Sequence, residues 1–245
     1  MKGKKFLACA LCLGMILTGC GSGSMSNKAK GGLIGTAAGG AAGTGLGAAI
    51  GALVNGKKGA KIGAAIGAGV GVAGGATAGA LIGKKMDKAA AAAAAAVANA
   101  DVEKTTDANG LDAVKVTFDN GILFKVGKST LQAGAQKSLS QFAANVLNVY
   151  TDCDVAIMGF ASSDGSDATN LTLSQARANA VKAYLTGTCG VSASQIKSSV
   201  GYGEDPQYLV FDANGKEDVN ASRRVEVYLY ASESMIKAAN AGTLQ

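Results

Sequence analysis

The chain has 245 residues, a formal net charge of +6, and neither histidine nor tryptophan. Without histidine, the Ser-His and Cys-His nucleophile pairs and most zinc sites are excluded, so an enzyme is not expected. The charge is +10 over residues 1–100 and −4 over residues 101–245, and the basic lysines flank apolar runs without aromatics or arginines, which favours a membrane surface over nucleic acid.

Residues 1–19 have the features of a lipoprotein signal peptide. Three lysines precede an apolar run from Phe6 to Leu17, and the sequence Leu17-Thr18-Gly19-Cys20 follows. This sequence resembles the bacterial lipobox, which implies cleavage before Cys20 and lipidation of its thiol. Residues 20–30 would then be a flexible lipidated tether. By analogy, the absence of an aspartate after Cys20 favours the outer membrane. A chance cysteine behind an apolar run is the alternative.

Two cysteines remain after this assignment. Cys9 and Cys12 leave with the signal peptide and Cys20 carries lipid, so Cys153 and Cys189 are left in the mature chain. An even pair in an oxidising compartment predicts a disulfide. Two buried free thiols are the alternative.

Glycine recurs at every fourth position over residues 31–83. The series runs through Gly35, Gly39, Gly43, Gly47 and Gly51 and resumes from Gly59 to Gly83. Small residues at this spacing form one face of a helix and let two backbones approach closely, as in lipid. Residues 31–54 and 60–83 are each long enough to cross a bilayer as a helix. We expect a glycine-zipper helical hairpin that inserts into a membrane or forms homo-oligomers; a flexible low-complexity spacer is the alternative.

Residues 84–110 are expected to form an Ala-rich helical linker. The run Ala89–Ala96 has the strongest helix-forming composition available. The polar stretch Asp101–Gly110 adds slack, so this linker would let a following domain stand clear of the membrane.

Residues 111–232 have the pattern of a folded domain, followed by a tail over residues 233–245. Val114, Val116 and Phe118 alternate with polar residues, as in a strand with one buried face. An amphipathic helix follows over residues 139–150, then a strand at 155–159, a second helix at about 170–185, and strands at 196–202 and 225–230. The order β-α-β-α-β-β predicts an α+β fold, a two-layer α/β sandwich with two helices on one face of a mixed sheet. The glycines of this domain are expected to form turns.

Four stretches of residues 112–231 resemble the OmpA C-terminal family of peptidoglycan-binding domains. They are Val116–Phe124, the run Gly159-Phe160-Ala161-Ser162-Ser163-Asp164-Gly165 with Asn170, Leu173-Ser174 and Arg177-Ala178, the run Gly201-Tyr202-Gly203-Glu204 with Pro206, and Ser222–Glu226. The second matches the family pattern G-H-T-D-x-x-G-x-x-x-x-N-x-x-L-S-x-x-R-A at most anchor positions. The third lacks one residue of the family pattern G-x-G-E-x-x-P.

The resemblance implies a ligand site for the peptidoglycan stem peptide. The family aspartate and arginine that grip diaminopimelate correspond to Ser162 and Arg177, so the carboxylate is missing and Asp164 is its expected substitute. Asn170 is predicted to be a helix N-cap and a ligand contact. Arg223 and Arg224 open a strand expected at or near the sheet edge, and one of them, assigned as Arg223, supports the site. Catalytic residues, metal ligands and cofactors are not expected.

These features together predict an outer-membrane lipoprotein whose domain lies in the periplasm and binds peptidoglycan noncovalently, tethering the envelope to the wall. The second hypothesis is an oligomeric membrane assembly or pore built on the glycine zipper, in which wall binding only positions the complex. A cell-wall hydrolase is a third hypothesis, and the chain shows no paired carboxylates or activated nucleophile to favour it.

Overall fold

The computed structural model describes residues 75–107 and 110–245, and these contain a five-stranded mixed sheet with the strand order β1-β2-β5-β3-β4. Its strands are β1 (Ala100–Thr106), β2 (Asp112–Asp119), β3 (Cys153–Gly159), β4 (Ile196–Gly201) and β5 (Arg224–Ala231). β3 and β4 pair in parallel and the other neighbours are antiparallel. The expected α+β fold is confirmed, and the four strands predicted from residue 113 onward correspond to β2–β5.

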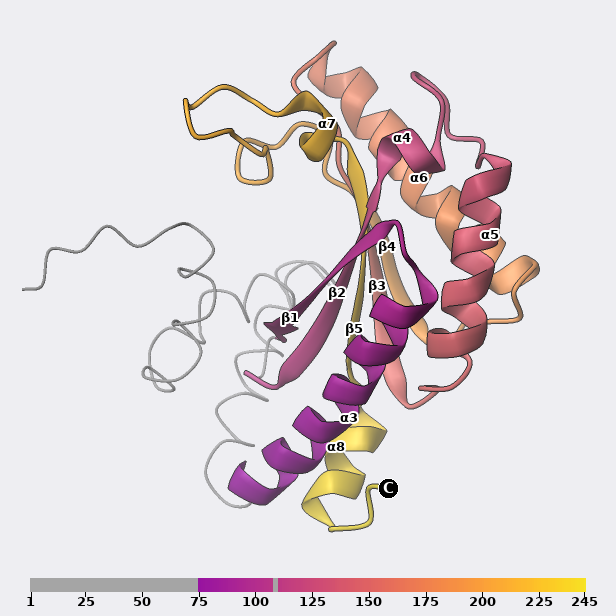
Figure 1. Ribbon diagram of the computed structural model, residues 1–245, viewed down its shortest axis with the longest axis vertical. Helices are drawn as coiled ribbons and strands as arrows, with labels where there is room; N and C mark the ends of the chain where they lie inside the picture. The colour runs from indigo at the N-terminus through magenta and orange to yellow at the C-terminus, as the bar shows by residue number, and fades with distance from the viewer. Residues whose placement is uncertain (1–74, 108–109) are drawn as a thin grey trace, which may run out of the picture. The chain divides into compact units, whose positions relative to one another are not determined.

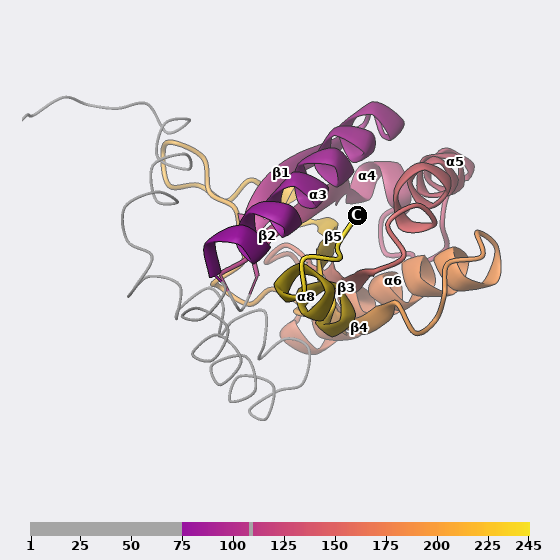
Figure 2. The ribbon, with the colours of Figure 1, turned by 90° about the horizontal axis from the view of Figure 1, so that it is seen from below.

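Helices cover one face of this sheet (Figure 1). They are α3 (Gly75–Ala96), the short α4 (Asn120–Leu123), α5 (Ala133–Phe142) continued by a π-helical turn η1 (Ala143–Leu147), α6 (Asp167–Gly187) and α8 (Glu233–Asn240). The short α7 (Val219–Ser222) lies at the end of the sheet opposite α8. The two helices expected from periodicity correspond to α5–η1 and α6. Figure 2 shows α3, α5 and α6 side by side in this layer.

The main core lies between the sheet and these helices. Strand alternation turns Val114, Val116 and Phe118 toward the helices, and all three are buried. Phe118 meets Phe142 of α5 edge-to-face, with ring centroids 5.7 Å apart. Burial of each such large apolar side chain stabilises the fold by roughly 1.5–3 kcal/mol. The alternating apolar residues of β2 and the apolar stripe of α5 thus pack together in one core.

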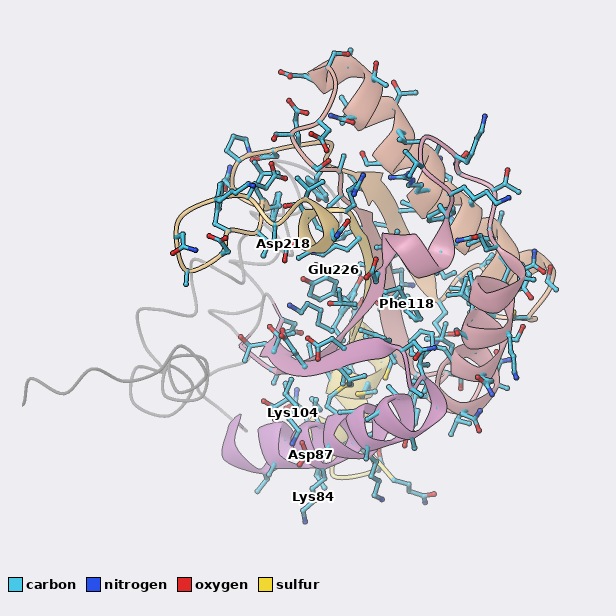
Figure 3. The ribbon with its side chains drawn as sticks, turned by 45° about the horizontal axis from the view of Figure 1, so that its top comes forward. Lys84, Asp87, Lys104, Phe118, Asp218 and Glu226 are labelled. Carbon is cyan, nitrogen blue, oxygen red and sulfur yellow. The ribbon has the colours of Figure 1, made fainter. Side chains whose placement is uncertain are left out.

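The N-terminal boundary of the folded unit differs from the expected one at residue 111. α3 buries Ile82, Met86 and Ala89 in the same core as the strands. The segment expected to add slack forms β1 instead, an edge strand paired with β2 from Ala100↔Phe118 to Thr106↔Asp112. Figure 3 shows Asp87 of α3 beside Lys104 of β1, which form a salt bridge of 2.5 Å. The helix predicted for this segment is present, but its small alanines pack tightly on the sheet, so it is not a linker.

The C-terminal segment is also part of the core. Ser232 caps α8 by accepting a hydrogen bond from the Met235 amide at 3.1 Å, and Met235 and Ile236 are buried. α8 packs against α3. Lys85 of α3 donates to Asp152 at 2.6 Å and to the main-chain oxygen of Gln245 at 3.2 Å. The expected tail is therefore a helix that closes one end of the core (Figure 2).

Most of the predicted glycine-zipper hairpin lies outside the described residues. Its last positions, 75–83, belong to α3, which continues without a break through Gly83 and Lys84. Among the described residues, the structure contains no helix that is both long enough and apolar enough for a membrane span.

The predicted disulfide is not formed. Cys153 and Cys189 are both free thiols. Cys153 opens β3, pairs with Ala231 of β5 and is buried, whereas the Cys189 sulfur lies 3.7 Å from the Ser140 hydroxyl of α5. The topology brings the two residues toward the same end of the sheet, but Cys153 is enclosed within the strands and Cys189 contacts the helix layer. Burial, with a smaller contribution from Asp152, raises the pKa of the Cys153 thiol to about 12.

Candidate functional site

The candidate site lies where several loops meet at one end of the sheet. The register pairs Asp119 with Arg224, Gly159 with Val225, and Gly159 with Gly201, so the ends of β2, β3 and β4 and the start of β5 come together. α4, the first turn of α6, and α7 lie at this end, opposite α8 (Figure 1). The stretches that carried the family resemblance, far apart in the sequence, therefore converge in space.

Two glycines let α6 approach the sheet closely at this end. A Cβ on Gly159 would lie 2.3 Å from the Ser174 oxygen, and a Cβ on Gly201 would lie 2.1 Å from the Gln175 nitrogen. Both glycines are strand residues. Our expectation that the domain's glycines only form turns is therefore wrong for these two, because they are needed for close contact between helix and strands. By contrast, Gly165, with φ +110°, does turn the loop before α6.

Asn170 holds the loop between β3 and α6 in place. Its amide donates to the main-chain oxygens of Ser162 at 3.1 Å and Asp164 at 2.9 Å, and also to the Glu204 carboxylate. The N-cap prediction for Asn170 is wrong, because α6 begins at Asp167 and its N-cap is Ser166, whose side chain accepts from the Thr169 amide. Asn170 is buried one turn inside the helix, where it fixes the loop from the helix side.

Arg177 of α6 is only 2% exposed. Its Nε donates to the Lys128 oxygen at 3.0 Å, and its guanidinium lies 5.5 Å from the Phe124 ring centroid. Burial, and next the nearby Arg223, lower the pKa of Arg177 to about 10. Arg177 therefore stays positively charged at neutral pH and provides a buried cation at the site.

Ser162 and Asp164 differ strongly in exposure. Ser162, at the position of the family aspartate, is 3% exposed. Its hydroxyl donates to the Asp164 carboxylate at a long 3.4 Å. Asp164 itself is exposed, and within the described residues its carboxylate accepts this hydrogen bond from Ser162. The proposed substitute carboxylate is thus near Ser162 but weakly held.

Arg223 and Arg224 are placed differently from the expectation. β5 lies in the middle of the sheet between β2 and β3, not at or near an edge, and it begins at Arg224. Arg223 directly follows α7 as its C-cap, and its guanidinium donates to the Val219 oxygen at 3.1 Å and to the Asn220 side chain at 2.8 Å. It influences the pKa of Arg177 and so shares its neighbourhood.

Arg224 belongs to the supporting structure of the site. Its Nε donates to Glu226 at 2.7 Å, and its guanidinium lies 4.2 Å from the Phe160 ring centroid. Phe160 in turn stacks on Tyr202, with centroids 5.5 Å apart, and contacts Tyr208 at 5.1 Å. Glu226 and Asp218 lie at this end of the molecule in Figure 3. The aromatic cluster anchors the loops after β3 and β4 on the sheet face opposite the main core.

Two acidic residues that the sequence did not single out for the site also line it. The hydrogen bond between the carboxyl groups of Glu204 and Asp167 favours the protonated form of Glu204 and raises its pKa, while the hydrogen bond from Asn170 acts in the opposite direction. Glu217 accepts hydrogen bonds from the amide and hydroxyl of Ser163. Local periodicity could not identify Glu217, because it lies 54 residues from Ser163 in the sequence.

This chemistry suits binding of a charged, hydrogen-bonding ligand. Arginines supply fixed positive charge and multiple donors for carboxylates, and the carboxylates accept from ammonium or amide groups. In the described part of the chain, groups of three Cys, Asp or Glu residues arranged to hold a metal ion are not found.

The fold and the site define an α+β ligand-binding domain with its site built from loops at one end of the sheet. Residues 123–224 match the OmpA family model, and this part of the chain is an OmpA family domain.

The chain is similar to longer outer membrane proteins, of which the matched region covers only a part. Outer membrane porin F of Pseudomonas aeruginosa is 33% identical over 129 residues, which cover 52% of this chain and 36% of the porin. Outer membrane protein A of Yersinia pseudotuberculosis is 34% identical over 87 residues, covering 35% of this chain and 24% of that protein. Among solved structures, a MotB-like protein of Desulfovibrio vulgaris is 21% identical and covers 63% of this chain and 92% of its own, with a TM-score of 0.48. The chain thus spans 24–36% of the length of these two curated relatives.

Proposed function

We propose that the OmpA family domain binds peptidoglycan noncovalently, holding the wall's stem peptide at the loop end of the sheet. The observation that carries this proposal is the buried, charged Arg177 at the end where the family-like stretches converge. A guanidinium in a water-poor site binds a carboxylate more strongly than it would in bulk water. Asn170 contributes by fixing the loop around Ser162. This function requires no reaction.

We further propose that a lipid on Cys20 attaches the other end of the protein to the outer membrane, with the domain in the periplasm. The lipobox-like sequence before Cys20 supports the anchor. The relatives named as outer membrane proteins support the compartment. Linking a weak wall contact to a membrane anchor raises the effective concentration of each attachment. The protein would thus tether the envelope to the wall.

Cosedimentation of the full chain, in detergent micelles, with purified peptidoglycan tests the wall contact. Wild type is expected to pellet with the wall. Arg177→Lys keeps the charge but loses the planar fork of donors, and should weaken binding about tenfold. Lys137→Gln, an exposed change on α5, serves as the control and should bind like wild type. A wild-type protein that stays in the supernatant contradicts the proposal.

The lipid anchor has its own test. Cys20→Ser removes the acceptor thiol, so the protein should lose the mass of the acyl groups and partition out of the membrane fraction when expressed in a bacterium with a lipoprotein pathway. Mass spectrometry of the wild-type N-terminus provides the direct readout. An unmodified wild-type Cys20 would contradict the anchor without affecting wall binding.

A further inference from the structure

Glu217 is a carboxylate held by several hydrogen bonds beside the loop that follows β3. The Ser163 amide donates to both of its oxygens, at 3.2 and 3.4 Å, and the Ser163 hydroxyl donates to one of them. Ser222 adds a further side-chain hydrogen bond. These contacts come from both sides, because Ser163 follows β3 and Ser222 precedes β5, and they hold the carboxylate in one position.

The segment that carries Glu217 is itself well ordered by hydrogen bonds. Phe211 and Glu217 form an isolated antiparallel bridge. Between them, the Asp212 carboxylate accepts from the amides of Asn214 at 2.8 Å and Lys216 at 3.0 Å. The Asp218 amide donates to the Val210 oxygen at 2.8 Å. A side chain on such a hairpin loses less entropy when it binds a ligand than one on an open loop.

Asp164 lacks these features. It is exposed, its carboxylate receives a 3.4 Å hydrogen bond from Ser162, and Gly165 with φ +110° follows it. Ser162 cannot carry charge. Compared with Asp164 and Ser162, Glu217 therefore combines a negative charge with a fixed position.

The electrostatics join Glu217 to the two arginines. Arg223 lowers the pKa of Arg177, and it also helps to lower the pKa of Glu217. Arg223 thus lies within electrostatic range of both groups. A ligand bound here meets positive charge from the arginines and negative charge from Glu217, and the complementary molecule carries both a carboxylate and an ammonium group.

We infer that Glu217 supplies the carboxylate that binds the ammonium group of a zwitterionic, amino-acid-like ligand at this site, in place of Ser162 and Asp164. The inference rests on the proposed function, because the stem peptide is the wall component with free amino-acid groups. A carboxylate has about four acceptor positions, and the contacts from Ser163 and Ser222 leave room for an additional donor.

Two small molecules separate the contribution of the ammonium group from that of the carboxylates. 2,6-Diaminopimelate and pimelate have the same carbon chain and the same two carboxylates, and only the former has ammonium groups. Calorimetric titration into the full chain in detergent should show diaminopimelate binding about tenfold more tightly than pimelate. Glu217→Gln should remove most of this difference while leaving pimelate binding within about twofold.

Matched variants make the result specific. Asp164→Asn and Glu233→Gln each remove one negative charge, the first beside Ser162 and the second on α8 at the far end of the sheet; both should keep the tenfold difference. Far-UV circular dichroism and unfolding midpoints verify that each variant is folded. If Glu217→Gln keeps the difference, or Asp164→Asn abolishes it, the inference is wrong.

Wall binding is scored separately on the same proteins. If wild type pellets with peptidoglycan but Glu217→Gln behaves like wild type in both assays, the proposed function stands and the assignment of Glu217 fails. If wild type binds diaminopimelate through Glu217 but does not pellet, the assignment stands and wall binding fails. If wild type binds diaminopimelate no more tightly than pimelate, the assignment of Glu217 is overturned.

Discussion

Gly201 of β4 lies directly against Gln175 of α6. The Gly201 amide donates to the Gln175 side chain at 2.9 Å, and a Cβ on Gly201 would come within 2.1 Å of the Gln175 nitrogen. The backbone of α6, the helix that carries Arg177, therefore packs directly against β4. This close packing is possible because Gly201 has no β-carbon.

Gly201→Ala should therefore destabilise the domain by about 3 kcal/mol, because backbone atoms of α6 have to move to make room. Urea denaturation followed by circular dichroism measures the loss. Gly134→Ala on α5 is the matched control: its Cβ meets nothing within 4 Å, and alanine favours the helix by up to about 1 kcal/mol. Equal stability of the two variants would contradict the close packing of α6.

Asn170→Ala should cost about 2–3 kcal/mol, because it removes the buried donor shared by the oxygens of Ser162 and Asp164 and leaves them without that partner. It should also weaken wall binding by loosening the loop. As a control, Asn145→Ala removes an exposed side chain that donates a hydrogen bond to the Gln141 oxygen. This variant should change the free energy of unfolding by less than about 0.5 kcal/mol. A variant of Asn170 that unfolds at the wild-type urea concentration would show that the loop is held by other means.

Met86→Ala tests whether α3 is part of the fold. Met86 is 1% exposed, and truncating a buried methionine typically costs about 2–5 kcal/mol. Lys88→Ala, two residues along on the exposed side of the same helix, should be close to neutral. If both substitutions left the free energy of unfolding unchanged, residues 84–110 would be a linker after all.

The two cysteines of the domain should behave as free thiols. With a pKa of about 12 for Cys153, roughly one molecule in ten thousand carries the reactive thiolate at pH 8. Iodoacetamide should therefore label Cys153 only after the protein unfolds, as read by peptide mass spectrometry. Reducing agent should leave the melting temperature unchanged. A peptide linking Cys153 to Cys189 would contradict the structure.

Glu217 should make the free energy of unfolding depend on pH in the acidic range. Partial burial acts to raise the pKa of Glu217, but hydrogen bonds from Ser163 and Ser222 and the charge of Arg223 lower it below its ordinary value of 4.5. A depressed folded-state pKa contributes stability above the unfolded value and loses it as the pH falls through the folded value. Wild type should therefore be more stable than Glu217→Gln at pH 7, and the difference should shrink as the pH falls below 4.5. A difference of the same size at pH 7 and in acid would contradict the ionised form as the source.

Short-range patterns in the sequence were enough for much of the fold. Alternation at Val114, Val116 and Phe118 and the helical stripe ending at Tyr150 predicted β2 and α5–η1 correctly, because each pattern reflects which side of one element is buried. The motif also singled out Arg177 as an expected ligand residue, and this assignment stays a prediction. The burial of Arg177 could not be predicted, because the Lys128 oxygen that accepts a hydrogen bond from its Nε belongs to a loop 49 residues away.

The amino-acid pattern was sufficient to predict the α+β class, the order of β2–β5 along the chain and the residue types available for a ligand site. The packing of α3, β1 and α8 into the core, the separation of Cys153 from Cys189 and the contact between Glu217 and Ser163 became apparent in the folded structure. Periodicity records the environment of a single element, whereas each of these outcomes depends on which distant surface covers it. Alanines that form a free helix in one context pack against a sheet in another, and the Glu217 carboxylate is held by a serine that lies 54 residues away in the sequence.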